Sequence, residues 1–415
     1  STVPDIPNRS RFNPFLFKGT FFSTGGYSAR YGQALSSALV LNTTDIADTS
    51  SGGLNVLPIG VGGFYQGKWN NTSLAMSGNY TDVNPLFSIN EHQPDWEVAP
   101  RAGGGSLIFR HKPTKSSIIK AYSTYNYQYF VVKNPDPFDP ENISRTHLQS
   151  HNLYTNLSYR NLLNDNWVLY AGLSHSLDAD DLTVNAVDIN RDDTRLQGKV
   201  WLSRLYGKNN KVWFGAETHR LINGQAFDIF NQEIQDQYTA AFAETEFYLS
   251  PKVAFRPGVR FEHSSILARV NLAPRASFAV KAGKYGSISL AYGSFYQNPT
   301  NDFLFNDADL EFERADHYLA NYTWIKNSRT FRVEGYYKNY ANLATGQTGF
   351  NGTVLPPYTN DGFGYATGVD VFWRDQKTIR NGDYFVSYSF LDTRRLYRDF
   401  PVEAQPYFAS DHNFS

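Results

Sequence analysis

From about residue 54 to residue 400 the chain alternates apolar and polar side chains with a period of two. This is the pattern of β-strands whose two faces meet different surroundings. The segments 330–338, 368–374 and 383–390 all show it. In 252–262 one face carries Val253, Phe255, Val259 and Phe261, and the other carries Ala254, Arg256, Gly258, Arg260 and Glu262.

Eight short polar turns interrupt the alternation at intervals of roughly 45 residues, wider than the strand spacing of a small sandwich. Longer polar segments lie between them. Short turns at one end and long loops at the other are typical of a transmembrane antiparallel β-barrel. The turns are 68–71, 112–115, 163–166, 207–210, 250–252, 282–285, 326–328 and 380–383, and the expected loops are 82–104, 134–148, 177–194, 222–236, 263–272, 297–313, 341–363 and 391–411.

The pattern predicts about sixteen strands between residues 54 and 400, and the start of another at 411–415. Since an unfinished strand would leave an open sheet edge, we expect the chain to be truncated at its C-terminus.

The stretch 23–43 differs from everything that follows it. Leu35, Leu39 and Leu41 fall on one face of a strand and small or apolar residues fall on the other. This predicts a strand buried on both faces, packed inside the barrel. We therefore expect 1–48 to be the end of an internal domain and 49–415 to be the barrel.

The composition agrees with a membrane barrel. Charged residues make up 19% of the chain, below the roughly 25% of soluble domains, and aromatic residues make up 16%. Trp69, Trp167, Tyr285 and Trp324 lie near strand ends, where aromatic girdles form. A soluble sandwich or propeller is the alternative, but a propeller would repeat a motif in each blade and the sequence repeats none.

Charge and residue content exclude several classes of function. The net charge of −1 with scattered Lys and Arg argues against nucleic acid as a partner. The absence of Cys excludes disulfides, thiolate nucleophiles and Cys-bound metals. No window approaches about 18 consecutive apolar residues, so a membrane crossing would have to use strands.

Several segments together resemble one family. The segment 25–39 resembles the end of the plug domain of TonB-dependent outer-membrane receptors, just before the first barrel strand. The resemblance continues in order along the barrel at 257–262, 272–276, 292–299, 313–318, 335–340 and 411–413. The plug motif consists of Gly25, Gly26, Tyr27, Arg30, Tyr31 and Gly32.

This resemblance, in its Bacteroidota style, implies a 22-stranded barrel in the bacterial outer membrane, with its lumen filled by a plug. It implies uptake of a scarce solute, such as a metal chelate, a cobalamin-like compound, an oligosaccharide or a peptide. The implied partners are the TonB energy complex, the nutrient, outer-membrane lipid and a surface lipoprotein. Neither a cofactor nor a metal is implied. The front of the plug and the TonB contact segment are expected to lie outside the chain.

Two groups of residues are candidates for contacts in the lumen. Arg256, Arg260, Glu262 and Arg275 fall on lumen-facing positions, where they would contact the plug or an anionic solute, or pair among themselves as a network in the wall. Tyr296, Phe303, Phe305 and Tyr340 are candidate solute-contacting aromatics of the outer loops, or ordinary loop packing.

Other polar patterns carry weaker signals. We expect the acidic residues of 178–193 to be solvated charges in an outward loop. His147 and His151 are about 13 Å apart on a strand, too far to share a metal. Ser174 and His175 are adjacent, so on a strand they point to opposite faces and form no catalytic pair.

Three functions are therefore open: a receptor for energy-coupled uptake that is no enzyme, a passive barrel channel, and a barrel hydrolase. The position of 23–43 separates the first two, since a passive channel would lack a plug in its lumen.

Overall fold

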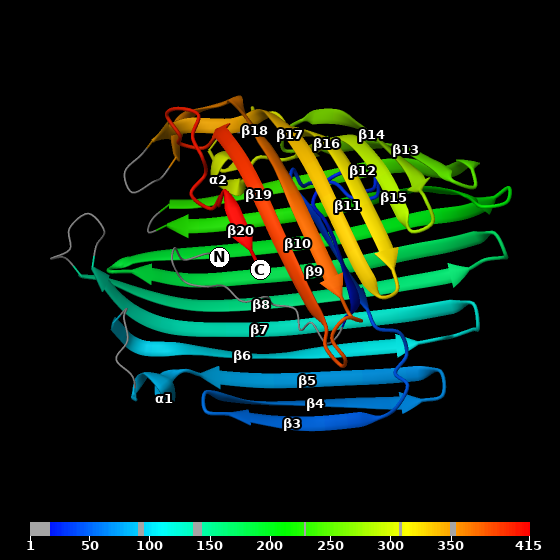
Figure 1. The fold of residues 1–415 in the computed structure, drawn as a ribbon. Helices are drawn as coiled ribbons and strands as arrows, with labels where there is room; N and C mark the ends of the chain where they lie inside the picture. Colours follow the sequence, from blue (N-terminus) through cyan, green and yellow to red (C-terminus); the bar gives the residue numbers. More distant parts are fainter. Residues whose placement is uncertain (1–16, 90–94, 136–142, 228–229, 307–308, 349–353) are drawn as a thin grey trace. The chain divides into compact units, whose positions relative to one another are not determined.

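The computed structural model describes the chain apart from 1–16, 90–94, 136–142, 228–229, 307–308 and 349–353 (Figure 1). The described residues are mostly in long antiparallel strands. Two single-turn helices, α1 (Asn84–Phe87) and α2 (Asn301–Leu304), lie in connections between strands. Neither described helix is long and apolar enough to cross a membrane.

Eighteen strands of the described chain, β3 to β20, are hydrogen-bonded in the order of a closed barrel. This confirms the all-β barrel predicted from the alternation. The chain divides into two compact units, one with 17–20, Leu41–Val200 and Glu217–Gln237, and the other with Phe21–Val40, Trp201–Ala216 and Tyr238–Ser415. We call them unit 1 and unit 2.

Unit 1 contains seven strands that pair antiparallel with their neighbours in chain order. They are β3 (Ser51–Leu57), β4 (Gly60–Trp69), β5 (Thr72–Asp82), β6 (Asp95–His111), β7 (Ser117–Pro135), β8 (Ile143–Leu162) and β9 (Trp167–Val184). The strands β10 (Val187–Tyr206) and β11 (Asn210–Phe227) have residues in both units.

Unit 2 contains the second ladder of antiparallel strands, again paired in chain order. They are β12 (Phe230–Ser250), whose first residues belong to unit 1, β13 (Val253–Ser264), β14 (Arg269–Ala282), β15 (Gly286–Gln297), β16 (Glu313–Lys326), β17 (Arg329–Thr348), β18 (Val354–Asp375), β19 (Tyr384–Leu396) and β20 (His412–Phe414).

All eight predicted short turns lie between consecutive strands, from the β4–β5 turn to the β18–β19 turn. The strand beginning predicted at 411–415 is β20. The described residues form one barrel strand more than the roughly sixteen that the pattern predicts before β20. This strand is β3, which the sequence does not separate from β4. The reason is that the connection between them contains the apolar Ile59, and the start of β3, Ser51–Gly53, has the composition of a polar linker.

Strands continue through more than half of five of the expected long loops, so these loops are shorter than predicted; they are 134–148, 177–194, 222–236, 263–272 and 341–363. The stretch 177–194 belongs to β9 and β10, which are joined at Asn185–Ala186. Strands β11, β12, β17 and β18 likewise extend into 222–236 and 341–363. The polar residues of these stretches wrongly predicted loops, because a strand that extends beyond the apolar band can be polar on both faces.

The stretch 23–43 is not one strand buried on both faces. Residues 24–37 are irregular, and only Ala38–Thr43 forms a strand, β2, which pairs with β1 (Phe17–Ser23). Leu39 of β2 is 58% exposed. The glycines explain the irregularity, because Gly26 has a φ of +59°, which breaks a strand. The buried residues of this stretch are Gly25, Tyr27, Ser28 and Ala29, within the irregular part.

The strands of unit 2 have two distinct faces. The inward face, which contacts residues 24–36, buries charged and polar side chains such as Glu244, Arg260 and Lys338. The outward face exposes apolar ones such as Phe261 and Leu272. Buried charge on one face and exposed apolar residues on the other is the arrangement of a barrel wall between a polar lumen and lipid.

The turn glycine Gly283 gives a test of the backbone. Its φ is +73°, and a Cβ there would meet nothing within 4 Å. We expect Gly283→Ala to lower the free energy of unfolding by about 1 kcal/mol through backbone conformation alone. Gly335 in β17 also has an unobstructed Cβ position, but no positive φ. Gly335→Ala should therefore raise stability by about 0.5 kcal/mol. Urea unfolding in detergent micelles measures both changes, and equal effects would contradict the structure.

Candidate functional site

Residues 24–36, which we call the plug-end loop because their sequence resembles the end of a plug domain, lie against the inward face of β12–β17. Apart from a turn bond from the N–H of Tyr31 to the carbonyl of Ser28, its backbone is not paired in a ladder. Buried backbone groups need partners, and side chains of the strands supply them. The site is therefore built from buried charges and polar groups that hold one irregular segment.

Glu244 of β12 holds the first part of the loop. Its Oε1 accepts the hydroxyl hydrogen bond of Ser28 at 2.9 Å, and its Oε2 accepts the backbone N–H of Ala29 at 2.8 Å. Arg256 of β13 approaches the same carboxylate, with Nε 3.3 Å from Oε1. Because Glu244 is only 4% exposed, these contacts compensate for burying its charge.

Arg275 of β14 binds three carbonyl groups of the loop through one nitrogen. Its Nη1 donates to the carbonyls of Tyr27 at 3.2 Å, Ser28 at 2.5 Å and Tyr31 at 2.7 Å. The guanidinium carbon lies 4.3 Å from the ring centroid of Phe295 and 4.9 Å from that of Tyr27. Flat stacking on aromatic rings suits Arg and not Lys, so the side chain both binds and packs.

A second buried group lies beside it in β12 and β13. The Nε of Arg260 donates to Oε1 of Glu262 at 2.6 Å, and its Nη2 donates to the hydroxyl of Tyr238 at 2.9 Å. The Tyr238 hydroxyl itself donates to Glu262 Oε1 at 2.6 Å. The Nη1 of Arg260 reaches the loop, at 3.3 Å from the carbonyl of Ala29. Arg260 and Glu262 are fully buried.

Gly32 fits directly against this pair. A Cβ at Gly32 would lie 2.2 Å from Glu262 Oε1 and 2.4 Å from Arg260 Nε. No side chain can be accommodated at such distances, so the loop approaches the ion pair closely only because residue 32 is glycine.

The far end of the loop is held by β16 and β17. Lys338 donates from Nζ to the carbonyls of Thr24 at 2.5 Å and Ser36 at 2.9 Å. The Nε2 of His317 lies 2.8 Å from the carbonyl of Leu35, and the N–H of Gly26 points to its Nδ1 at 3.4 Å. Since a carbonyl accepts and an N–H donates, these partners require a neutral ring with its hydrogen on Nε2.

Tyr27 forms the apolar centre of the loop. Its ring centroid lies 4.3 Å from that of Phe295, and its hydroxyl donates to the carbonyl of Ala34 within the loop. Burial raises the pKa of Tyr27 above its usual value, against the opposing effect of Arg275, so the hydroxyl stays a donor.

The structure brings together most of the residues that the sequence singled out. Arg260 and Arg275 contact the plug-end loop directly, and Glu262 acts through Arg260 and Tyr238. Arg256 pairs with Glu244 and Glu246. Whether these charges also contact a solute stays a prediction.

The remaining motif residues also lie in the loop. Arg30 lies with its guanidinium 5.5 Å from the ring centroid of Trp213, and Tyr31 supplies a carbonyl to Arg275. Glu244, His317 and Lys338 were missed by the sequence reasoning. A signal was available, because each lies on the buried face of an alternating strand, where a charged or polar side chain needs a partner.

The four candidate aromatics have different packing partners. Tyr340 is 2% exposed and packs with Ala315, Leu343 and Ala366. Phe303 is also buried and lies edge-on to Tyr358, with ring centroids 5.2 Å apart. The ring of Tyr296 lies edge-on to that of Phe312, with centroids 6.3 Å apart. Phe305 is half-buried just after α2. In this structure Phe303 and Tyr340 serve as packing residues, and a role in solute binding stays a prediction.

The acidic residues of 178–193 are strand residues and not loop charges, which corrects the expectation. Asp178 accepts a hydrogen bond from Asn152 Nδ2 at 2.9 Å, and Asp188 accepts one from the Thr183 hydroxyl at 2.8 Å. His147 and His151 both lie in β8, as the spacing argument assumed. Across the described part of the chain, His, Asp and Glu form no group of three that could hold a metal.

Solved structures share this fold. The FrpB iron transporter from Neisseria meningitidis has 13% identity and a TM-score of 0.73, with 92% of this chain and 68% of that one covered. The siderophore receptor PirA from Pseudomonas aeruginosa has 12% identity and a TM-score of 0.67, with 89% and 72% covered. The RagAB peptide importer has 11% identity and a TM-score of 0.60, with 83% and 51% covered.

These similarities confirm the barrel fold that the resemblance implied. The chain spans 64 to 72% of the length of the first four structures found. No protein-family model and no curated protein sequence matches it. The similar structures are receptors and transporters that handle different cargo, so the fold alone does not identify a solute.

Gly32 gives a direct test of the site. We expect Gly32→Ala to destabilise the bound loop by about 3 kcal/mol, because the new methyl group overlaps a buried ion pair. Trypsin cleavage after Arg30 reports the detached loop, and it should become ~100-fold faster. Gly172→Ala in β9 is the control, because its Cβ comes only within 3.8 Å of the Leu157 carbonyl. Unchanged cleavage in Gly32→Ala would show that the loop is not held there.

Arg275 gives a second test. Arg275→Ala leaves three loop carbonyls without their shared donor, so we expect a loss of about 3 kcal/mol in unfolding free energy. Arg275→Lys should recover part of the loss, because it keeps the charge but not the stacking. The control is Arg269→Ala, at a half-exposed residue with carboxylates 3.7 and 3.8 Å away, and it should have no measurable effect. Equal effects of the two Ala variants would contradict the assignment.

Proposed function

We propose that the chain carries the end of the plug and most of the barrel of a TonB-dependent outer-membrane receptor, which takes up a scarce solute with energy from the inner membrane. The single observation that carries this proposal is the plug-end loop, held by Glu244, Arg275 and Lys338 on the charged face of the barrel strands. A passive channel needs an open, water-filled lumen, and a segment held by buried charges on the inward face favours a plugged barrel instead.

The outward face supports a place in the outer membrane. On β16 the outward positions between Asp316 and Lys326 are Tyr318, Ala320, Tyr322 and Trp324, none of them charged. A tilted strand crosses the apolar part of a bilayer with about 9–11 residues, which is the length of this uncharged face. Trp324 stacks near Trp373 with ring centroids 6.3 Å apart, as an aromatic girdle would.

The contacts of the loop support energy coupling. Removing the loop would separate the buried Glu244 from the Ala29 N–H and Arg275 from its carbonyls at once. Uncompensated buried charges cost several kcal/mol each, so thermal motion would clear the path rarely. We infer that work from the TonB complex moves the plug, and that the front part of the plug would receive it.

The proposed cargo is a metal chelate, a cobalamin-like compound, an oligosaccharide or a peptide, with a surface lipoprotein as a further candidate partner. The long connections between strands would select among them, because binding residues concentrate on loops. We propose binding and transport without covalent chemistry. In β9 Ser174 and His175 are adjacent and so project to opposite faces, which argues against the hydrolase.

Planar-bilayer conductance tests the plug. We expect the protein to conduct less than a variant in which residues 24–36 are replaced by a Gly-Ser segment of equal length, because the native loop fills part of the lumen and the flexible one leaves it. A Gly-Ser replacement of the exposed segment 401–403, in the connection after β19, is the control for the manipulation itself. Equal conductance of the protein and the first variant would favour the passive channel.

A further inference from the structure

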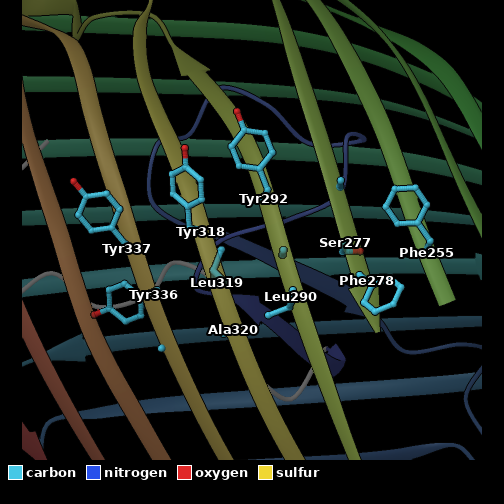
Figure 2. A pocket seen from close by; sticks show the side chains of 13 residues that line it. Phe255, Ser277, Phe278, Leu290, Tyr292, Tyr318, Leu319, Ala320, Tyr336 and Tyr337 are labelled. Atoms are coloured by element: carbon cyan, nitrogen blue, oxygen red, sulfur yellow. The ribbon is translucent and has the colours of Figure 1, made fainter. Parts of the chain in front are cut away.

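The outward face of unit 2 carries a hollow of about 550 Å³ across β13 to β17 (Figure 2). Its wall is formed mainly by apolar and aromatic side chains, among them Phe255, Phe278 and Leu290. It lies on the face opposite the plug-end loop, so neither the loop nor its charged partners explain it.

Small residues create the hollow. Across the strands, Phe278 pairs with Leu290, Leu290 with Ala320, and Ala320 with Gly335, so these four share one outward row. Ala320 and Gly335 have small side chains or none, so the surface is recessed there beside the large side chains of Phe278 and Leu290. A Cβ built on Gly335 would meet nothing within 4 Å, which shows that the space beside it is open.

A row of three tyrosines borders the hollow. Tyr292, Tyr318 and Tyr337 lie side by side on three neighbouring strands (Figure 2), with ring centroids 5.2 Å and 6.3 Å apart. The next outward row is polar and contains Ser294 and Asp316, which share a hydrogen bond of 2.6 Å. The hollow therefore lies just inside the boundary at which this face changes from apolar to polar.

We propose that the hollow binds one hydrocarbon chain of a membrane lipid, whose polar head lies at the tyrosine hydroxyls. The inference rests on the proposed membrane location. A lipid is the expected occupant because the exposed apolar surface continues beyond the hollow at Ile288, one row further from the polar row, and at Val369, which pairs with Gly335. A lipid tail suits it since it carries no polar groups, whereas an irregular protein segment would bring unpaired backbone groups into the apolar band.

The site would fix one lipid among many that contact the barrel. An ordinary barrel surface is convex and touches a lipid tail along one side only. A tail in the hollow contacts Ala320 and the ring of Tyr318 as well, and each additional buried CH₂ group strengthens binding roughly 4-fold. A lipid held in this way would stay bound while its neighbours exchange.

Filling the hollow tests the proposal without making the surface polar. Ala320→Leu and Gly335→Val place methyl groups in the open space, whereas Ala243→Leu enlarges an exposed, outward residue of β12 outside it. The purified protein in mild detergent is titrated with phosphatidylethanolamine and followed by native mass spectrometry. We expect one lipid to bind the protein and Ala243→Leu equally, and either filled variant ~10-fold more weakly, as the loss of about two CH₂ contacts implies.

Two outcomes would overturn the inference: filled variants that bind the lipid as tightly as the protein does, or an Ala243→Leu variant that is weakened as much as they are. Insertion into lipid vesicles, followed as protease-protected β-structure, is measured for every variant. If the protein itself does not insert, the membrane location fails and the lipid site with it. If all variants insert and bind equally, only the lipid site fails.

Discussion

The structure of unit 2 depends on one constraint: an irregular segment buried against a sheet must find partners for its backbone groups outside any ladder. The plug-end loop meets this constraint with charged side chains. Arg275 binds three carbonyls, Glu244 binds an N–H and a hydroxyl, and Lys338 joins the two ends of the loop. Charged groups make stronger hydrogen bonds than neutral ones, which suits a segment with few other contacts of its own.

The same constraint explains the composition of the strands. A charged side chain is expensive to bury, so it is kept on the inward face only where the loop or a neighbouring strand pairs with it, as Arg260 and Glu262 do. The outward face has the opposite requirement and exposes apolar side chains. Apolar and polar side chains thus alternate along the sequence because the two faces of each strand meet different surroundings.

Glycine determines where the loop can approach the wall. At Gly32 and Gly25 a Cβ would overlap Glu262 and His317, and at Gly26 the backbone takes a positive φ. These glycines allow backbone and buried polar side chains to meet at hydrogen-bonding distance. The plug motif is therefore a steric requirement of the charged wall, and the motif and the wall charges act as one unit.

The sequence by itself determined the barrel, because a period of two and a run of short turns depend only on residues that are near in the chain. It identified the eight turns and placed Arg260, Glu262 and Arg275 on the inward face. It missed β3, extended loops through the ends of β9 and β17, and read 24–37 as a strand. Only the tertiary structure decided those points, and only it showed Glu244 and Lys338 as partners of the loop. The reason is that these partners lie more than 200 residues from the segment they hold, a separation that no local pattern encodes.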